Sequence, residues 1–182
     1  ANGYLIDQFL RDTPNQRTDA YGGSLENRAR LLFEVLTAVT QAIGSERVGL
    51  RLSPLNSFNS MKDSDPLALI GFLADRLNAF KLAYLHVMRA DFFGVQKADV
   101  MPVAREKYKG VLVGNMGYSA DEAEAAIAEG KLDAVAFGTA FLANPDLPAR
   151  IRAKAPLNAP DSNTFYAGGA KGYTDYPTLQ VA

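Results

Sequence analysis

The sequence predicts an α/β protein that forms about half of a (β/α)8 barrel. Four short apolar runs alternate with amphipathic segments at helical spacing, the pattern of a parallel sheet with crossover helices. Two successive runs end in glycine, and the run over 110–115 is mostly apolar, as expected for a strand buried on both faces. The 182 residues fall short of the roughly 250 residues of a complete barrel. An open doubly wound sheet is the alternative architecture.

The first expected helix covers 24–43, because Ser24 can cap it and apolar residues recur at helical spacing until Gly44. Its apolar stripe consists of Leu25, Ala29, Leu32, Phe33, Leu36, Val39 and Ile43. The first strand follows over 48–53, where alternation places Arg51 on the face opposite the apolar residues.

Three further β/α units follow along the chain. Asp65 can cap the next helix, with Pro66 at its first position. The buried stripe of that helix is Leu67, Ile70, Leu73 and Leu77. Ser119 and Glu122 have capping-box spacing for a later helix. The remaining elements are expected as a strand over 82–88, a helix over 100–108, a strand over 110–115, a helix over 119–129, a buried strand over 133–137 and a short helix over 145–154.

Both ends of the chain are expected to be irregular. The first 23 residues predict an aromatic and polar loop with no strand before it, and the segment 155–182 is rich in Gly, Pro and Tyr. Since four strands make roughly half a barrel, we interpret residues 1–182 as one half-barrel that a partner chain or segment completes.

The composition excludes several classes of function. A net charge of −1 gives no electrostatic footprint for a nucleic acid or an anionic membrane. The absence of cysteine excludes a thiolate nucleophile and any Cys-containing metal site, and one histidine leaves little for metal binding. No apolar run approaches the roughly 18 residues of a membrane span. We therefore expect a soluble, cytoplasmic protein.

Candidate binding residues follow the expected strands. Gly114-Asn115 and Gly138-Thr139 come directly after two strands, where barrels commonly bind phosphate through backbone N–H groups. The same glycines also suit tight turns, and the residues alone leave both interpretations open. Arg51 can complement an anionic ligand, although an ion pair with a neighbouring carboxylate is the simpler interpretation.

Two further side chains have structural interpretations that compete with catalytic ones. Tyr4 can donate a proton, but a tyrosine beside Leu5 and Ile6 is more often a packed aromatic. His86, the single histidine, is expected to be a core residue with satisfied hydrogen bonds.

Longer motifs resemble one family, the Old Yellow Enzyme family of flavin-dependent ene-reductases, and are most similar to its N-ethylmaleimide reductase-like branch. The resemblance covers nearly the whole chain and is carried by Asn2 to Leu10, Asn15 to Ala29 (NQRTDAYGGSLENRA), Val48 to Pro54 (VGLRLSP), Leu85 to Val87, Phe137-Gly138, Ala143 to Pro148 (ANPDLP) and Phe165 to Pro177 (FYAGGAKGYTDYP).

The resemblance implies the C-terminal half of an FMN-containing barrel. Such an enzyme uses NADPH or NADH to reduce the C=C bond of α,β-unsaturated carbonyl or nitro compounds, with hydride delivered from flavin N5. The segment 155–182 would line the active site. The partner would be a complementary N-terminal half-barrel, since a four-stranded half exposes strand edges and apolar surface.

The resemblance also implies roles for individual residues. Tyr4 would protonate the substrate, and Asn2 would hydrogen-bond its carbonyl oxygen beside a second residue that would precede Ala1. Arg51 would face flavin N1 and O2. The remaining flavin contacts would be the backbone amides of Gly114, Asn115, Gly138 and Thr139, which hold the phosphate, and Tyr166.

One position departs from the family pattern. Thr139 stands where the family usually has an arginine that grips the phosphate, so a hydroxyl replaces a charge. Two other classes of function remain open from the sequence: a non-catalytic half-barrel that associates with itself, and an independent module that binds a phosphate-containing ligand.

Overall fold

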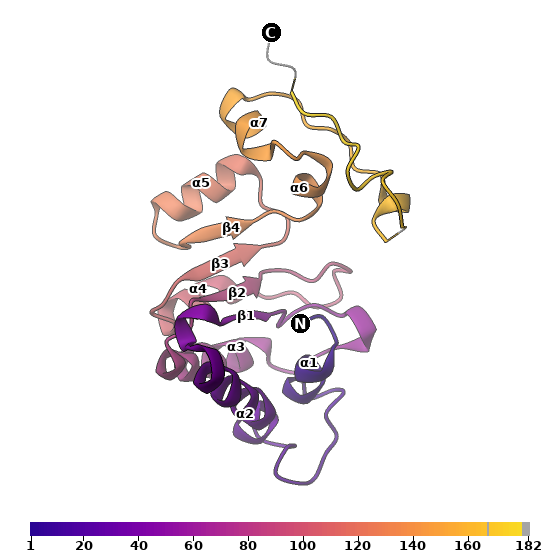
Figure 1. The fold of residues 1–182 in the computed structure, drawn as a ribbon. Helices are drawn as coiled ribbons and strands as arrows, with labels where there is room; N and C mark the ends of the chain where they lie inside the picture. The colour runs from indigo at the N-terminus through magenta and orange to yellow at the C-terminus, as the bar shows by residue number, and fades with distance from the viewer. Residues whose placement is uncertain (167, 180–182) are drawn as a thin grey trace. The chain divides into compact units, whose positions relative to one another are not determined.

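The computed structural model describes residues 1–166 and 168–179. Its four strands pair in chain order and are all parallel (Figure 1). They are β1 (Gly49–Leu52), β2 (Tyr84–Met88), β3 (Leu112–Asn115) and β4 (Ala134–Ala136). The predicted α/β fold with a parallel sheet is confirmed.

The chain divides into two compact units, Ala1–Ala136 and Phe137–Ala182. The first unit holds the sheet with α1 (Leu5–Leu10), α2 (Leu25–Ile43), α3 (Pro66–Leu77), α4 (Val100–Lys107) and α5 (Ala120–Ala128). The second holds α6 (Thr139–Ala143) and α7 (Leu147–Ala153). In the described part of the tail after α7, one short 3-10 turn forms at Ser162–Thr164.

Side-chain caps begin the helices where the sequence predicts them. Asp65 Oδ1 accepts a hydrogen bond from the Ala68 N–H, and Ser119 Oγ accepts one from the Glu122 N–H. The Glu122 carboxylate pairs with Arg89, the residue after β2. The side chain of Glu122 thereby connects α5 to the carboxyl end of a strand.

The two faces of the sheet differ in burial. Leu50, Leu85 and Leu112 are buried in the core shared with the helices. Arg51 and His86 pair in register on the opposite face and are only partly buried. The alternation predicted for β1 is therefore confirmed, and it leaves a polar, partly exposed face on the sheet.

The first segment of the chain is not entirely a loop as predicted, because it contains the helix α1. Asp7 in its first turn accepts a hydrogen bond from the Gly3 N–H, and Leu10 is buried in the core. A helix of six residues is too short to show a clear hydrophobic period, so its stability comes from these tertiary contacts. The helix α6, also short, was likewise not predicted.

Several residues predicted to be buried are exposed. Val39 and Ile43 at the end of α2 and Leu67 at the start of α3 face solvent. The strand predicted over 133–137 is only partly buried, because β4 is the last strand of the sheet and pairs with β3 alone within the first unit. Val111 is exposed just before β3 begins.

A buried ion pair connects α2 to the loop before α3. Arg28 Nη1 lies 2.7 Å from Asp63 Oδ2 and also donates to the Leu10 carbonyl oxygen. The same carboxylate accepts the backbone N–H groups of Asp12 and Asp65. This one carboxylate therefore joins three segments of the first unit.

We expect Asp63→Ala to lower the free energy of unfolding by about 3–5 kcal/mol, since it leaves the Arg28 charge buried and unpaired. Asp19→Ala is the matched control, because Asp19 pairs with Arg17 at the surface. This substitution should lower the free energy of unfolding far less. Denaturant unfolding of both variants tests this. Equal losses for the two variants would contradict it.

Candidate active site

Arg51 and Asn2 form the centre of the candidate site, at the carboxyl end of β1. Arg51 Nη1 donates a hydrogen bond to Asn2 Oδ1 at 3.0 Å. Arg51 Nη2 and Asn2 Nδ2 both contact Met88 Sδ at 3.7 Å. The structure thus brings together two residues that the sequence analysis assigned to separate roles, one for the cofactor and one for the substrate.

The guanidinium of Arg51 has no acidic partner among the described residues. Burial alone lowers its pKa, and the neighbours that it contacts are an amide and a thioether. The simpler interpretation from the sequence, an ion pair with a carboxylate, is therefore wrong. A half-buried positive charge without a counter-ion favours an anionic ligand at this face of the sheet.

His86 and Asn115 lie on the same partly exposed face, on β2 and β3. His86 Nε2 and Asn115 Oδ1 are both buried without a hydrogen-bond partner among the described residues. The expectation that His86 is a satisfied core histidine is therefore wrong. Burial lowers the pKa of His86, and so does the nearby charge of Arg51, which keeps the imidazole neutral at pH 7.

The backbone of Asn2 and Gly3 is held in place by two side chains. The Asn2 N–H donates to Ser53 Oγ at 2.7 Å, and the Gly3 N–H donates to Asp7 Oδ2 at 2.8 Å. Gly3 has φ +84°, and a Cβ there would lie 2.6 Å from Asn59 Cβ. Glycine is therefore required at this position both by the backbone conformation and by the close approach of Asn59.

Arg11 is a functional support that the sequence analysis missed. It is fully buried, and its Nη1 donates to the Ser53 carbonyl oxygen at 2.9 Å. Its Nη2 donates to Gln96 Oε1 at 2.6 Å, in the loop after β2. The spacing of Asp7 and Arg11, four residues apart, was the one sequence signal that could have indicated this role. In the structure Arg11 Nη1 lies 3.7 Å from Asp7 Oδ1.

Arg89 supports the loop after β3. Its Nε donates to the Met116 carbonyl oxygen at 2.8 Å, and its Nη2 donates to the Gly117 carbonyl oxygen at 3.0 Å. Its guanidinium also stacks on Tyr118 at 3.6 Å from the ring centroid. Met116 has φ 86°, a left-handed conformation that is rare outside glycine and that these contacts stabilise.

The other predicted site residues fall into two groups. Tyr4 is 67% exposed, so the expectation of a packed aromatic is wrong. Gly114 is buried, and a Cβ there would meet Leu132 Cδ1 at 2.7 Å, so its lack of a side chain serves packing. Gly138, Thr139 and the fully exposed Tyr166 belong to the second unit.

Asp91 organises the loops that follow β1 and β2. Its carboxylate accepts hydrogen bonds from the backbone N–H groups of Ser57, Val95 and Gln96. Burial acts to raise the pKa of Asp91, but these hydrogen bonds outweigh it and hold the pKa at about 2. Asp91 is therefore ionised at neutral pH, and it fixes the loop that carries the exposed Phe93.

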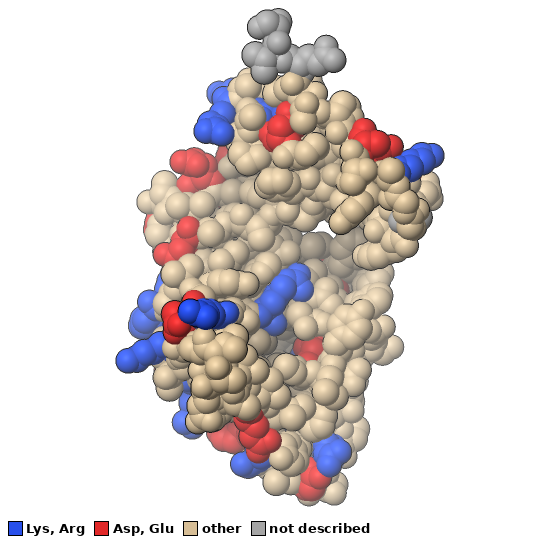
Figure 2. Space-filling view, viewed as in Figure 1, with Lys and Arg blue, Asp and Glu red and all other residues tan. Residues whose placement is uncertain are grey.

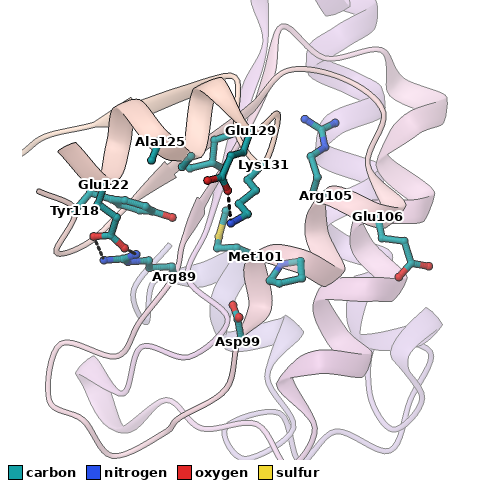
Figure 3. Close-up of a pocket in the computed structure, with 13 residues that line it drawn as sticks. Arg89, Asp99, Met101, Arg105, Glu106, Tyr118, Glu122, Ala125, Glu129 and Lys131 are labelled. Carbon is teal, nitrogen blue, oxygen red and sulfur yellow. Dashed lines mark hydrogen bonds and ion pairs between the residues drawn. The ribbon is translucent and has the colours of Figure 1, made fainter. Parts of the chain in front are cut away.

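A separate cavity of about 610 Å³ is lined by residues of α4 and α5 (Figure 3). Met101 contributes to its apolar wall, and dashed lines in Figure 3 join Arg89 with Glu122 and Lys131 with Glu129. Because these two cations are already paired with carboxylates, the cavity differs from the cluster around Arg51.

The described surface carries charges of both signs. Basic and acidic side chains are intermixed on the face drawn in Figure 2, in keeping with a net charge of −1. Across the described residues, no helix is both long and apolar enough to span a bilayer. No group of three or more potential metal ligands occurs in the part of the chain that the structure describes. The cytoplasmic location stays a prediction.

The parallel sheet is that of half a (β/α)8 barrel, and the arginine without a counter-ion at the carboxyl end of β1 marks a candidate site for an anionic ligand. The chain belongs to the NADH:flavin oxidoreductase / NADH oxidase family, which it matches over residues 1–158. The predicted resemblance to Old Yellow Enzyme is thereby confirmed at the level of the family.

Three known proteins illustrate the similarity. The chain is 60% identical over 180 residues to a Leishmania infantum protein named a probable flavin mononucleotide-dependent alkene reductase, covering 98% of this chain and 49% of that protein. The old yellow enzyme from Trypanosoma cruzi superposes with a TM-score of 0.96 at 45% identity, over 98% of this chain and 48% of that one. The structure of morphinone reductase in complex with tetrahydroNAD superposes with a TM-score of 0.91 at 45% identity, over 99% of this chain and 49% of that one.

The chain therefore spans about half the length of the relatives that it matches. This confirms the prediction of half a (β/α)8 barrel and is consistent with a C-terminal half. The residues present also fit an FMN group, since Arg51 offers a positive charge without a counter-ion. The buried, unpartnered atoms of His86 and Asn115 lie on the same face.

We expect Gly3→Ala to destabilise the protein by about 1–3 kcal/mol more than Gly23→Ala. Both glycines have φ +84°, but a Cβ at Gly23 meets no atom within 4 Å, whereas at Gly3 it collides with Asn59. The difference between the two variants therefore isolates the close contact from the backbone strain. Thermal unfolding measures it, and equal losses would show that the contact beside Asn2 is not tight.

Proposed function

We propose that this chain forms half of an FMN-dependent alkene reductase that reduces the C=C bond of α,β-unsaturated carbonyl or nitro compounds. The observation that carries the proposal is the half-buried Arg51, which lies beside Asn2 and has no acidic partner among the described residues. Membership of a flavin oxidoreductase family supports the choice of FMN as the cofactor. NADPH or NADH is the proposed reductant.

Bound FMN would supply hydride to the substrate. Arg51 would place its positive charge against the pyrimidine end of the flavin ring, where negative charge accumulates on reduction. Asn2 would donate its amide N–H to the substrate carbonyl oxygen, and Tyr4 would give a proton from its hydroxyl. The Asn2 amide is suited to this role, because among the described residues its nitrogen donates only to the weak acceptor Met88 Sδ. A carbonyl oxygen would be a stronger acceptor for the same N–H group.

The phosphate of FMN is proposed to bind backbone N–H groups of Gly114, Asn115, Gly138 and Thr139. Thr139 adds a hydroxyl donor but no charge. Tyr166 is proposed to lie beside the flavin and the substrate.

The partner is proposed to be a complementary N-terminal half-barrel, in the same polypeptide or in a second one. β1 pairs only with β2 among the described residues, so one of its edges is available to another strand. Tyr84 and Val111 are more than 40% exposed. Burying this apolar surface against a second half would stabilise both.

We expect Tyr4→Phe to slow reduction of an enone such as cyclohexenone by about 100-fold or more, because the proton donor is lost. Reduction of the flavin by NADPH should change little, since it needs no proton from Tyr4. Stopped-flow absorbance at the flavin band separates the two half-reactions. Tyr21→Phe is the matched control, because that hydroxyl bonds to Glu34 at the surface. Equal slowing of both half-reactions would refute the role of Tyr4.

Native mass spectrometry of the protein purified from its source tests the partner. We expect the mass of FMN together with a complementary half, as a second polypeptide or within one chain of about twice this length. A flavin-free assembly of this chain alone would instead favour the non-catalytic, self-associating half-barrel. A soluble monomer of this chain that binds FMN by itself would refute the need for a partner.

A further inference from the structure

His86 and Asn115 are diagonal neighbours on adjacent parallel strands. His86 pairs in register with Val113, and Asn115 lies two residues further along β3 on the same face. His86 Nε2 and Asn115 Oδ1 are both buried, and neither has a hydrogen-bond partner among the described residues. Two buried polar atoms without partners on one face are costly unless a small adjustment or a ligand satisfies them.

We propose that His86 is a positioning residue whose Nε2–H donates to Asn115 Oδ1, which turns the Asn115 amide NH2 group toward an acceptor oxygen of the bound flavin nucleotide. The flavin part of this inference rests on the proposed function. The pairing of the two side chains rests on the geometry alone.

The protonation of the imidazole decides whether this pair can form. A neutral histidine carries one N–H group, on either Nδ1 or Nε2. With the proton on Nδ1, His86 Nε2 and Asn115 Oδ1 would both be acceptors, and both would remain buried without a donor. With the proton on Nε2, one hydrogen bond satisfies both atoms.

The surroundings of His86 favour the neutral ring. Burial lowers the pKa of His86 and the charge of Arg51 lowers it further, while the neighbouring Asn115 side chain acts to raise it. Arg51 is the charged group that acts on His86, from the neighbouring strand. Because His86 is neutral, Arg51 supplies the positive charge at this face of the sheet. His86 then acts as a hydrogen-bond donor and Arg51 as the charge that attracts an anion.

The orientation of the Asn115 amide follows from this bond. Its oxygen is the buried end, and its nitrogen makes no hydrogen bond to a described residue, so the two amide N–H donors remain for a ligand. The reversed arrangement would have Asn115 Nδ2 donate to an unprotonated Nε2 and would present a carbonyl oxygen to the ligand. A phosphate or flavin oxygen, being an acceptor, would be repelled by that oxygen.

Nitrogen-15 NMR of histidine-labelled protein tests the pair without any variant, because this chain contains one histidine and loss of the signal in His86→Gln identifies it. We expect the Nε2–H tautomer at pH 7. An Nδ1–H tautomer would overturn the proposal. In Asn115→Leu the Nε2 proton should exchange with water at least about tenfold faster, and unchanged exchange would also overturn it.

Flavin affinity then separates positioning from general packing. His86→Leu removes the donor at similar volume and should weaken FMN binding by about tenfold, whereas His86→Gln keeps an N–H donor and should restore most of the affinity. Equal affinities in both variants and the unmodified protein would overturn the positioning role. These affinities are measured on the protein assembled with its complementary half. Failure of that unmodified assembly to bind FMN would overturn the proposed function and the flavin part of this inference, whereas the tautomer of His86 would still show whether the His86–Asn115 hydrogen bond forms.

Discussion

The buried guanidinium of Arg11 is the constraint on which the candidate site depends. It donates hydrogen bonds to the carbonyl oxygen of Ser53, just after β1, and to the side chain of Gln96 in the loop after β2. Arg11 itself is the residue that follows α1. A guanidinium has several donors in a rigid plane, so it fixes the directions of all these groups together. Asn2 lies just before α1, and its N–H donates to Ser53 Oγ, in the residue whose carbonyl oxygen Arg11 binds.

The chemistry of the exposed face depends on how charge is distributed among its polar residues. Arg51 remains charged next to neutral neighbours, and His86 is kept neutral by its burial and by that charge. Asp91 is ionised but uses its oxygens to hold backbone N–H groups, so it does not neutralise Arg51. The result is one localised positive charge, on Arg51, among neutral donors and acceptors, which favours an anionic ligand at this face.

Local patterns in the sequence predicted the elements that depend on local physics. Alternation in β1 placed Arg51 on the correct face, and Asp65 and Ser119 cap helices as predicted. The short helix α1 was missed, because it is stabilised by groups distant in sequence such as Ser53. The sequence could not predict that Arg51 lacks a counter-ion among the described residues, because the number of carboxylates does not show where they lie in the fold. The family motifs supplied roles that spacing alone could not.

The order of the strands has a consequence for how the chain acquires its structure. Each strand pairs with the one that precedes it in the chain, so no pairing has to wait for a distant segment. During synthesis a new strand therefore emerges beside an edge that is already formed, and the sheet grows in one direction. β1 supports the growth of the sheet on the side of β2, and its other edge pairs with no strand among the described residues.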